Sequence, residues 1–114
     1  MVKGPYVPDA GDIVWLEFDP QAGHEQAGHR PAVVLSPKAY NNKSSLMLCC
    51  PMTTQIKGYP FEVETIVDGM RTVALADQVK SLDWRVRKAK FKAKIDELDL
   101  NEIKAKLKPL LQMA

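Results

Sequence analysis

The stretch KAKFKAKI, residues 88–95, alternates lysine with apolar residues. Side chains of a β-strand point in turn to its two faces, so this period of two predicts a strand. The expected outer face carries Lys88, Lys90, Lys92 and Lys94, and the thin inner face carries Ala89, Phe91, Ala93 and Ile95. Segment 85–94 is basic and contains no acid, which indicates a polyanion or an acidic partner. An edge strand whose lysines only prevent edge-to-edge pairing is the alternative.

Upstream of this stretch, short β-type segments alternate with polar connections. Strands are expected at residues 12–19, 31–36, 46–52, 61–65 and 71–76. Loops or turns are expected at 19–30, 37–45 and 53–60, and an irregular connection at 77–84.

The last sixteen or so residues change to a helical period. The apolar residues that follow this spacing are Leu100, Ile103, Leu107, Leu110 and Leu111. Asp99 and Glu102 have the spacing of a capping box, which places the helix start there. Pro109 should kink the helix or weaken its last turn. About six short strands followed by one helix favour a mainly β fold, an antiparallel barrel with the helix packed on it.

Length and composition restrict the class of protein. A chain of 114 residues is expected to form one domain, residues 1–114. No apolar run approaches the ~20 residues of a membrane span, and the N-terminus has no apolar signal core, so we expect a cytoplasmic protein without membrane contact. Cys49 and Cys50 are neighbours and should not bridge each other. Two cysteines and two histidines give no metal-ligand spacing, and we expect no metal and no cofactor.

The candidate chemistry lies in two polar loops, each joined to a buried strand. If strands 31–36 and 46–52 pair antiparallel, Arg30 at the start of one lies near Thr53 at the end of the other. A guanidinium beside a hydroxyl can hold a phosphate and stabilise charge that develops on it. The alternatives are a solvated Arg30 or one paired with Glu25, and a Thr53 that only bonds its own backbone in a turn.

The remaining conspicuous side chains have ordinary interpretations as well. Histidines in a loop, here His24 and His29, are more often exposed than catalytic. Trp15 and Trp84 are more often core or dimer-contact residues than platforms for base stacking. A nucleophilic cysteine is disfavoured, because both thiols lie in an apolar segment.

Several blocks in order carry a resemblance: GHEQAGHRPAVVLSP (23–37), YNNK (40–43), TTQIKGYPFEV (53–63) and ALADQVKS (74–81). Together they resemble the MazF family of toxin–antitoxin ribonucleases, also called PemK-like toxins. The similarity spans nearly the whole chain and is weakest at 64–73, at 85–98 and at Pro109. It implies an SH3-like barrel with a C-terminal helix, a homodimer, and a metal-independent endoribonuclease that cuts single-stranded messenger RNA at a short sequence. It also implies inhibition by a cognate acidic antitoxin.

Carried over by position, the resemblance implies that Arg30 and Thr53 are the catalytic pair. Residues around the RNA would be Glu25, His29, Lys57, Gln78 and Lys80. Either Glu25 or His29 could serve as the general base, and the loop 19–30 is expected to order when RNA binds. Two other functions stay open: a barrel that binds nucleic acid without cutting it, and a toxin of similar fold that poisons DNA gyrase. The recognised RNA sequence is not specified, although an ACA-like triplet is the default.

Overall fold

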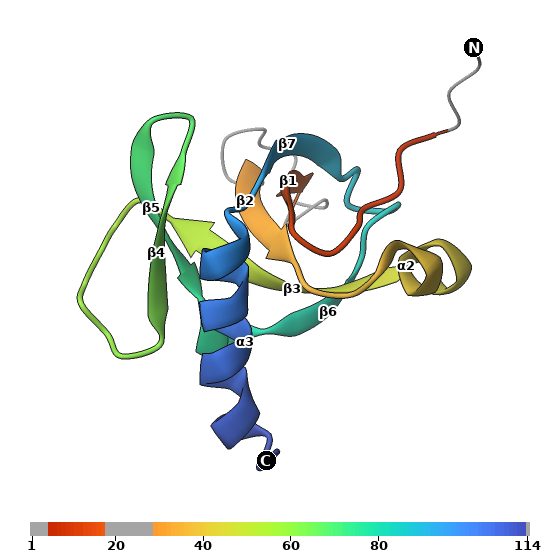
Figure 1. The fold of residues 1–114 in the computed structure, drawn as a ribbon. Coiled ribbons are helices and arrows are strands. Elements are labelled where there is room, and N and C mark those ends of the chain that lie inside the picture. Colours follow the sequence, from red (N-terminus) through yellow and green to blue (C-terminus); the bar gives the residue numbers. More distant parts are fainter. Residues whose placement is uncertain (1–4, 18–28, 114) are drawn as a thin grey trace.

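A computed structural model describes residues 5–17 and 29–113 of the protein. Within these residues the strands are β1 (Asp12–Glu17), β2 (His29–Val34), β3 (Leu46–Thr53), β4 (Glu62–Val67), β5 (Met70–Leu75), β6 (Lys80–Asp83) and β7 (Lys90–Lys94). The helices are α2 (Lys38–Ser44), the short 3₁₀ helix η1 (Ala76–Gln78) and α3 (Glu97–Leu110). The mainly β fold with a C-terminal helix is confirmed (Figure 1).

The strands pair antiparallel into one curled sheet. Its order is β4-β5-β3-β2-β1-β7, and β6 pairs with β3 outside this path. β3 is the longest strand, and it changes partner along its length: Leu46–Cys49 pair with β6, whereas Met52 and Thr53 pair with β5. Since β3 also pairs with β2 along its other edge, it joins both parts of the sheet. The β4–β5 hairpin therefore stands apart from β1 and β7, and the sheet forms a half-barrel (Figure 1).

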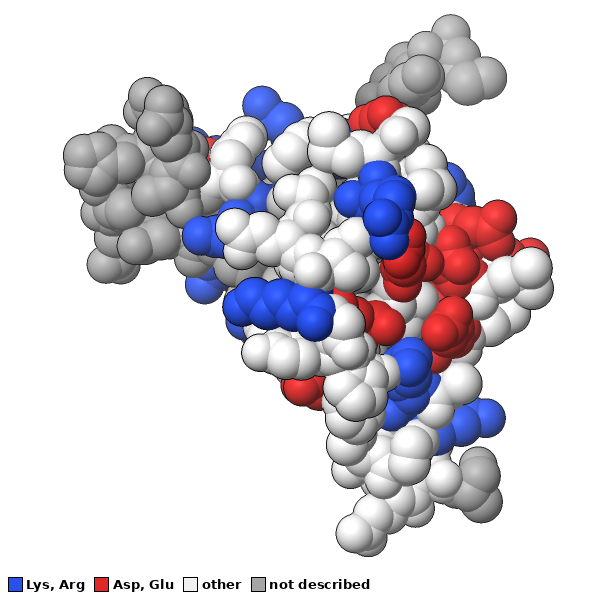
Figure 2. Space-filling model, turned by 90° about the vertical axis from the view of Figure 1, so that its left-hand side faces the viewer, with Lys and Arg blue, Asp and Glu red and all other residues white. Residues whose placement is uncertain are grey.

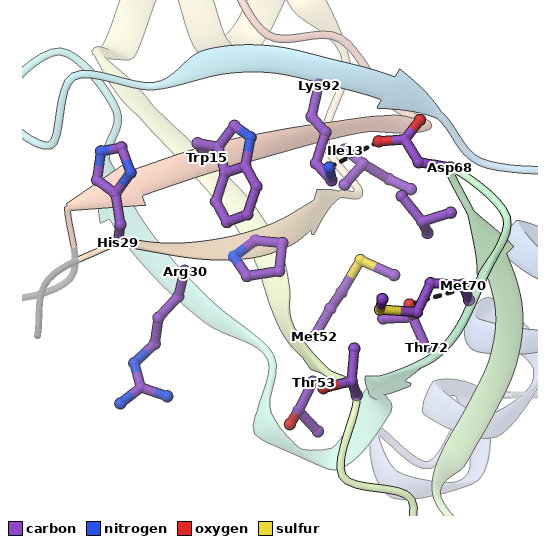
Figure 3. Close-up of a pocket in the computed structure, with 13 residues that line it drawn as sticks. Ile13, Trp15, His29, Arg30, Met52, Thr53, Asp68, Met70, Thr72 and Lys92 are labelled. Carbon is purple, nitrogen blue, oxygen red and sulfur yellow. Dashed lines mark hydrogen bonds and ion pairs between the residues drawn. The ribbon is translucent and has the colours of Figure 1, made fainter. Parts of the chain in front are cut away.

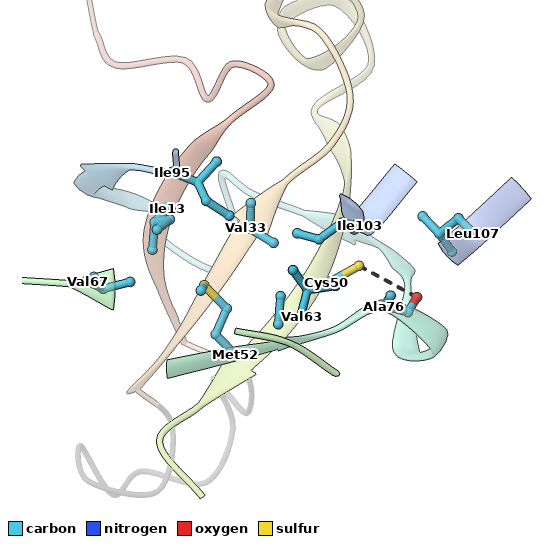
Figure 4. Packing of buried hydrophobic residues seen from close by; sticks show 11 residues of the cluster. Ile13, Val33, Cys50, Met52, Val63, Val67, Ala76, Ile95, Ile103 and Leu107 are labelled. Atoms are coloured by element: carbon cyan, nitrogen blue, oxygen red, sulfur yellow. Dashed lines mark hydrogen bonds between the residues drawn. The ribbon is translucent and has the colours of Figure 1, made fainter. Parts of the chain in front are cut away.

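Both faces of the sheet are covered by apolar side chains. One cluster joins the inner face to α3 and includes Ile13, Val33, Met52, Ile103 and Leu107 (Figure 4). The other lies on the opposite face, around Val14, Leu16, Val34, Cys49 and Trp84. Burying each fully enclosed aliphatic side chain contributes about 1.5–3 kcal/mol to folding. Because neighbours such as Ile13 and Val14 belong to different clusters, the central strands read as continuous apolar runs rather than as alternating ones.

The helix α3 begins earlier than the sequence pattern predicts. Asp96 is its N-cap, and one carboxylate oxygen accepts a hydrogen bond of 2.8 Å from the backbone N–H of Leu98. The predicted capping box at Asp99 and Glu102 is wrong, because Asp99 lies inside the first turn, where its carboxylate accepts a 2.6 Å hydrogen bond from the hydroxyl of Thr65. The helix ends at Leu110, one residue after Pro109. No helix in the described part of the chain has the length and apolarity to cross a membrane.

Two segments expected to be irregular form regular structure. Residues 38–44 form the helix α2, which ends at Ser45 in the left-handed conformation with φ of 65°. A helix of seven residues is too short for an apolar period to reveal it. Residues 80–83 form β6, whose four residues pair with β3 although none of them is fully buried. Both elements are fixed by contacts with distant parts of the chain rather than by local preference.

Asn41 is the centre of one such set of contacts. Its side chain is buried and donates hydrogen bonds to the carbonyls of Pro8 (2.8 Å) and Ser36 (3.0 Å). Its side-chain oxygen accepts a 2.6 Å hydrogen bond from the Ser36 hydroxyl, and its backbone carbonyl accepts one of 2.9 Å from the Trp84 indole. Asn41 thereby connects the N-terminal segment, α2 and the segment that follows β6.

The strand β7 departs from the simple alternation of its sequence. Ala93 lies opposite Ile13 and Phe91 opposite Val14, so one step along β1 corresponds to two steps along β7. Lys92 is the extra residue of this β-bulge, and a bulge shifts the side chains beyond it to the other face. The prediction of four lysines outside and Phe91 inside is therefore wrong: Phe91 is 52% exposed, whereas the Lys92 side chain is only 20% exposed.

We expect Asn41→Ala to lower the free energy of unfolding by about 3 kcal/mol, because it leaves several buried hydrogen-bonding groups without partners, at ~1–3 kcal/mol each. Urea denaturation measures the change. Asn42→Ala is the matched control: this neighbour in α2 is exposed, and its loss should change the stability by no more than ~0.5 kcal/mol. Equal effects of the two substitutions would contradict the role given to Asn41.

Candidate functional site

Arg30 and Thr53 are brought together by the pairing of β2 with β3. The register aligns Val33 with Cys50 and Ala32 with Pro51. The β2–β3 pairing ends there: Arg30 lies two residues before Ala32, Thr53 lies two residues after Pro51, and both residues border one cavity. The proximity predicted from the two loops is therefore present in the structure.

The cavity has a volume of about 500 Å³ and lies between the two parts of the half-barrel (Figure 3). β1, β2 and β7 form one wall, the β4–β5 hairpin forms the other, and the end of β3 lies between them. Its apolar lining consists of Ile13, Trp15, Pro31, Met52, Val67 and Met70. Its polar lining consists of His29, Arg30, Thr53, Thr54, Asp68, Thr72 and Lys92.

Aromatic rings and one ion pair characterise the wall opposite the hairpin. The rings of Trp15 and His29 are nearly parallel, with an interplanar angle of 12° and centroids 5.9 Å apart. The ammonium of Lys92 lies 4.7 Å from the centre of a Trp15 ring and forms a 2.7 Å ion pair with Asp68. Asp68 and Gly69 form the β4–β5 turn, both with positive φ, so the ion pair connects the hairpin tip to β7. Trp15 and Lys92 are thus site residues that the sequence analysis did not assign.

Arg30 and His29 point in opposite directions, as neighbours on a strand must (Figure 3). His29 lies beside Trp15, whereas the Arg30 side chain extends away from Trp15 and Lys92. Arg30 is exposed, and no described residue forms a hydrogen bond with its guanidinium. In the described part of the chain, nothing therefore competes with an anion for this group.

Thr53 forms a hydrogen bond between its side chain and the nearby backbone, as expected for a threonine in a turn. Its hydroxyl oxygen accepts a hydrogen bond of 3.1 Å from the backbone N–H of Gln55. This bond fixes the position of the oxygen at the end of β3. The hydroxyl proton is not donated to any described residue, so the same group can still donate to a ligand.

Two further cations belong to the face on which Arg30 and Thr53 lie. Lys80 is opposite Cys49 in the β3–β6 register, and the alternation of side chains along β2 and β3 gives Arg30, Thr53 and Cys49 one common face. Arg87 also lies near Cys49, and its guanidinium donates a 3.2 Å hydrogen bond to the carbonyl of Glu17. Arg87 stood out in the sequence only as one member of a basic segment.

The other residues implied by the resemblance are more scattered. Lys57 lies in the loop before β4, where its ammonium is 5.9 Å from the centre of the Tyr59 ring and its backbone N–H donates to the carboxylate of Glu62. Gln78 is exposed in η1, and neither Lys57 nor Gln78 lines the cavity. Glu25, His24 and most of the loop 19–30 lie outside the described residues.

The cysteines do not supply a nucleophile. Burial raises the pKa of Cys49 to about 12, despite the nearby Lys80 and Arg87, which lower it. Burial, Cys49 and Asp77 raise the pKa of Cys50 to about 12 as well. Both thiols are therefore protonated near neutral pH. In the part of the chain that the structure describes, no three His, Cys, Asp or Glu side chains are grouped as metal ligands.

A curled antiparallel sheet with a C-terminal helix, and a polar cavity beside the ends of β2 and β3, define a small β domain with a binding cavity. The chain belongs to the family of PemK-like, MazF-like toxins of type II toxin–antitoxin systems, which it matches over residues 9–111. It is 58% identical to the endoribonuclease toxin MazF of Escherichia coli K12 over 106 residues, which are 93% of this chain and 96% of that protein.

Solved structures agree with this assignment. MazF of Deinococcus radiodurans superimposes with a TM-score of 0.84 at 55% identity, covering 96% of this chain and 100% of that one. A MazE–MazF structure from the same organism gives 0.83 at 48% identity, with the same coverage. The family resemblance and the barrel-like fold inferred from the sequence are confirmed.

The buried thiols should make stability fall with rising pH. An unfolded chain releases thiol protons near pH 8.5, whereas the folded chain retains them up to about pH 12. The folded state then binds more protons, so the free energy of unfolding decreases between these values. We expect a loss of about 1 kcal/mol for each thiol between pH 8 and 9.5, measured by urea denaturation. A variant with Cys49→Ala and Cys50→Ala should lose this part of the pH dependence; an unchanged slope would contradict the prediction.

Proposed function

We propose that the protein cuts single-stranded messenger RNA at a phosphate bound between Arg30 and Thr53, at a short recognition sequence and without a metal ion. The chain is a MazF-like endoribonuclease toxin of a type II toxin–antitoxin system. The observation that carries the proposal is that the guanidinium-bearing residue and the hydroxyl-bearing one, near the ends of two paired strands, border the same cavity. Residues 1–114 act in this proposal as a single toxin domain.

The reaction uses a nucleophile that RNA itself contains. The 2′-oxygen of the ribose loses its proton and attacks the adjacent phosphorus, forming a 2′,3′-cyclic phosphate. The bond from phosphorus to the 5′-oxygen breaks, and that oxygen gains a proton to become a 5′-hydroxyl. The protein must align the attack, transfer the protons and stabilise negative charge on the phosphoryl oxygens.

Arg30 is suited to the electrostatic part of this task. Its guanidinium is planar, permanently charged and able to form two hydrogen bonds to one phosphate. Thr53 donates a further hydrogen bond to the same oxygens from a position fixed by the Gln55 backbone. Removing one preorganised donor of this kind typically lowers the rate by about a hundredfold or more.

Proton transfer from the 2′-hydroxyl is assigned to Glu25. The stacking of His29 beside Trp15 directs the imidazole away from the Arg30 guanidinium (Figure 3), which disfavours His29 as the base for a phosphate held by Arg30. Arginine itself is a poor base, because its pKa exceeds ~12 in water. His29 is instead assigned to RNA binding, together with Lys57, Gln78 and Lys80.

The proposed partners are RNA, a cognate antitoxin and a second copy of the chain. The cationic face of Arg30, Lys80 and Arg87 favours an RNA backbone or the acidic tail of an antitoxin. One of the similar solved structures is that of MazE–MazF from Deinococcus radiodurans. Exposed apolar residues on α3 and on the hairpin, such as Leu110 and Ile66, supply surface for a homodimer. Such a toxin acts in the cytoplasm, where messenger RNA is found.

The lysines of β7 contribute less to RNA binding than their number suggests. Lys92 is paired with Asp68 at 2.7 Å, and Lys94 is paired with the buried Asp12 at the same distance. A lysine whose charge is already neutralised by a carboxylate displaces few counterions from the RNA when it contacts a phosphate.

Arg30→Lys should lower the rate of RNA cleavage about a hundredfold, because the charge remains but the forked geometry is lost. The assay is cleavage of a long single-stranded RNA in the presence of a chelator, with the new ends identified as cyclic phosphate and 5′-hydroxyl. Thr53→Ala should show a comparable loss. Arg71→Lys is the matched control, since Arg71 is an exposed arginine on β5 that pairs with Glu64 and lies outside the cavity lining.

The cleavage assay, together with measurements of RNA binding and of toxicity, distinguishes the competing functions. Cleavage that survives chelation but stops when the attacking nucleotide is 2′-deoxy supports the mechanism. Binding of RNA without cleavage would favour a non-catalytic module. Toxicity that is retained by Arg30→Ala would favour a poison of DNA gyrase instead.

A further inference from the structure

A second cavity lies on the side of the molecule opposite the β4–β5 hairpin (Figure 1). Its volume is about 370 Å³, and it shares no lining residue with the cavity of Arg30 and Thr53. The residues that line it are Pro5, Val7, Asn42, Trp84, Arg85, Lys88 and Ala89. We propose that this second cavity binds a small aromatic carboxylate, at a site independent of RNA cleavage.

Three segments that are distant in sequence form the second cavity: the N-terminal segment, α2 and the connection 84–89 between β6 and β7. The β3–β6 register pairs Leu46, at the start of β3, with Asp83, the residue before Trp84. Thr53 lies at the other end of β3, roughly 23 Å away at ~3.3 Å per residue. The two cavities are therefore at opposite ends of this strand.

The second cavity carries positive charge at its border. Neither Arg85 nor Lys88 forms an ion pair with a described residue, and the described lining contains no acid. On the side of the molecule that carries the hairpin, by contrast, basic and acidic side chains are interspersed (Figure 2). Two such cations beside one cavity favour an anionic ligand.

The guanidinium of Arg85 is held in place by its neighbours. One of its nitrogens donates hydrogen bonds to the backbone carbonyl and to the side-chain oxygen of Asn42, both at 3.2 Å. The same guanidinium lies 4.2 Å from the centre of a Trp84 ring. Among the described residues these contacts occupy one nitrogen and one face. Because Arg85 is exposed, its other N–H groups and its other face are available to a ligand.

The connection 84–89 forms a tight turn that fixes the backbone of both cations. The carboxylate of Asp83 accepts hydrogen bonds of 3.0 Å from the backbone N–H groups of Arg85 and Val86. Lys88 has a positive φ of 54°, and its backbone N–H donates to the carbonyl of Arg85 at 3.1 Å. Asp83 is engaged in these hydrogen bonds and does not line the cavity. The positive charge is therefore presented on a hydrogen-bonded edge.

The rest of the lining decides which kind of anion fits. Most of it is apolar and consists of Pro5, Val7, Trp84 and Ala89. A bare phosphate would contact the cations but leave these side chains in water. The carboxylate of an aromatic acid can pair with Arg85 and Lys88, while its ring packs on the apolar walls and stacks on the guanidinium. The volume of about 370 Å³ is near the lower limit of the ~300–1,000 Å³ typical of small-ligand sites, which favours a ligand with one ring.

The test follows the indole N–H signals of the two tryptophans by NMR while 3-phenylpropionate is added to the full-length protein. Trp84 lines the second cavity, and Trp15, which lines the other cavity, is the internal control. Trp15→Phe leaves Trp84 as the only tryptophan and thereby assigns the two signals. The Trp84 signal should shift with a Kd between about 0.1 and 1 mM, whereas the Trp15 signal should stay in place.

The contributions of the carboxylate and of the two cations are measured separately. The uncharged 3-phenylpropanamide, which has nearly the same shape, should bind at least about tenfold more weakly. Arg85→Gln and Lys88→Gln change exposed side chains, and each should raise the Kd for 3-phenylpropionate roughly threefold to tenfold. Lys104→Gln is the matched control: it removes the same charge from an exposed position on α3 outside the lining, and should leave the Kd unchanged.

The proposal is overturned if the Trp84 signal does not move at about 10 mM 3-phenylpropionate, or if both indole signals move alike. It is overturned as well if the amide or inorganic phosphate produces the same shift at the same concentration, or if both glutamine variants keep the wild-type Kd. RNA cleavage enters none of these outcomes, so the proposed function is tested separately from this site.

Discussion

The antiparallel pairing of β2 with β3 is the constraint on which the site depends. It lies at the centre of the sheet order, and β3 is the strand that holds both parts of the half-barrel together. The pairing that aligns Val33 with Cys50 in the core also brings the strand ends that carry Arg30 and Thr53 to one cavity. A slip of one residue in this register would turn Arg30 to the other face, away from Thr53. Core packing therefore helps to position two polar residues at the surface, the exposed Arg30 and the half-buried Thr53.

The elements that the sequence predicted correctly are strands in which several consecutive residues are buried. The apolar segments of β1, β2 and β3 indicated strands because both of their faces are covered. The proximity of Arg30 and Thr53 followed from the same segments once antiparallel pairing was assumed. The family itself became recognisable only from several blocks in order, since each polar loop alone has an ordinary structural interpretation.

The parts that could not be predicted depend on single interactions between distant residues. The helix α2 has no periodic signature and is held by the buried Asn41, whose partners include Pro8 and Trp84. The bulge in β7 depends on its register with β1, which a sequence of alternating lysines does not reveal. It moved Lys92 from an expected solvent face to the cavity wall and left Phe91 exposed. The start of α3 was likewise misplaced, because the Asp99 carboxylate accepts a hydrogen bond from Thr65 and Asp96 caps the helix instead.

The ion pair between Asp68 and Lys92 has a mechanical consequence. The sheet path ends at β4 and β7, so described backbone hydrogen bonds do not close the barrel between them, and a side-chain contact spans the gap instead. A partly exposed ion pair contributes at most about 1 kcal/mol and weakens with salt. On one side, the two parts of the sheet are therefore joined by a single weak ion pair. On the other side, they are joined by the backbone hydrogen bonds of β3, which are harder to break. A toxin built in this way can vary the width of its cleft without disturbing its core.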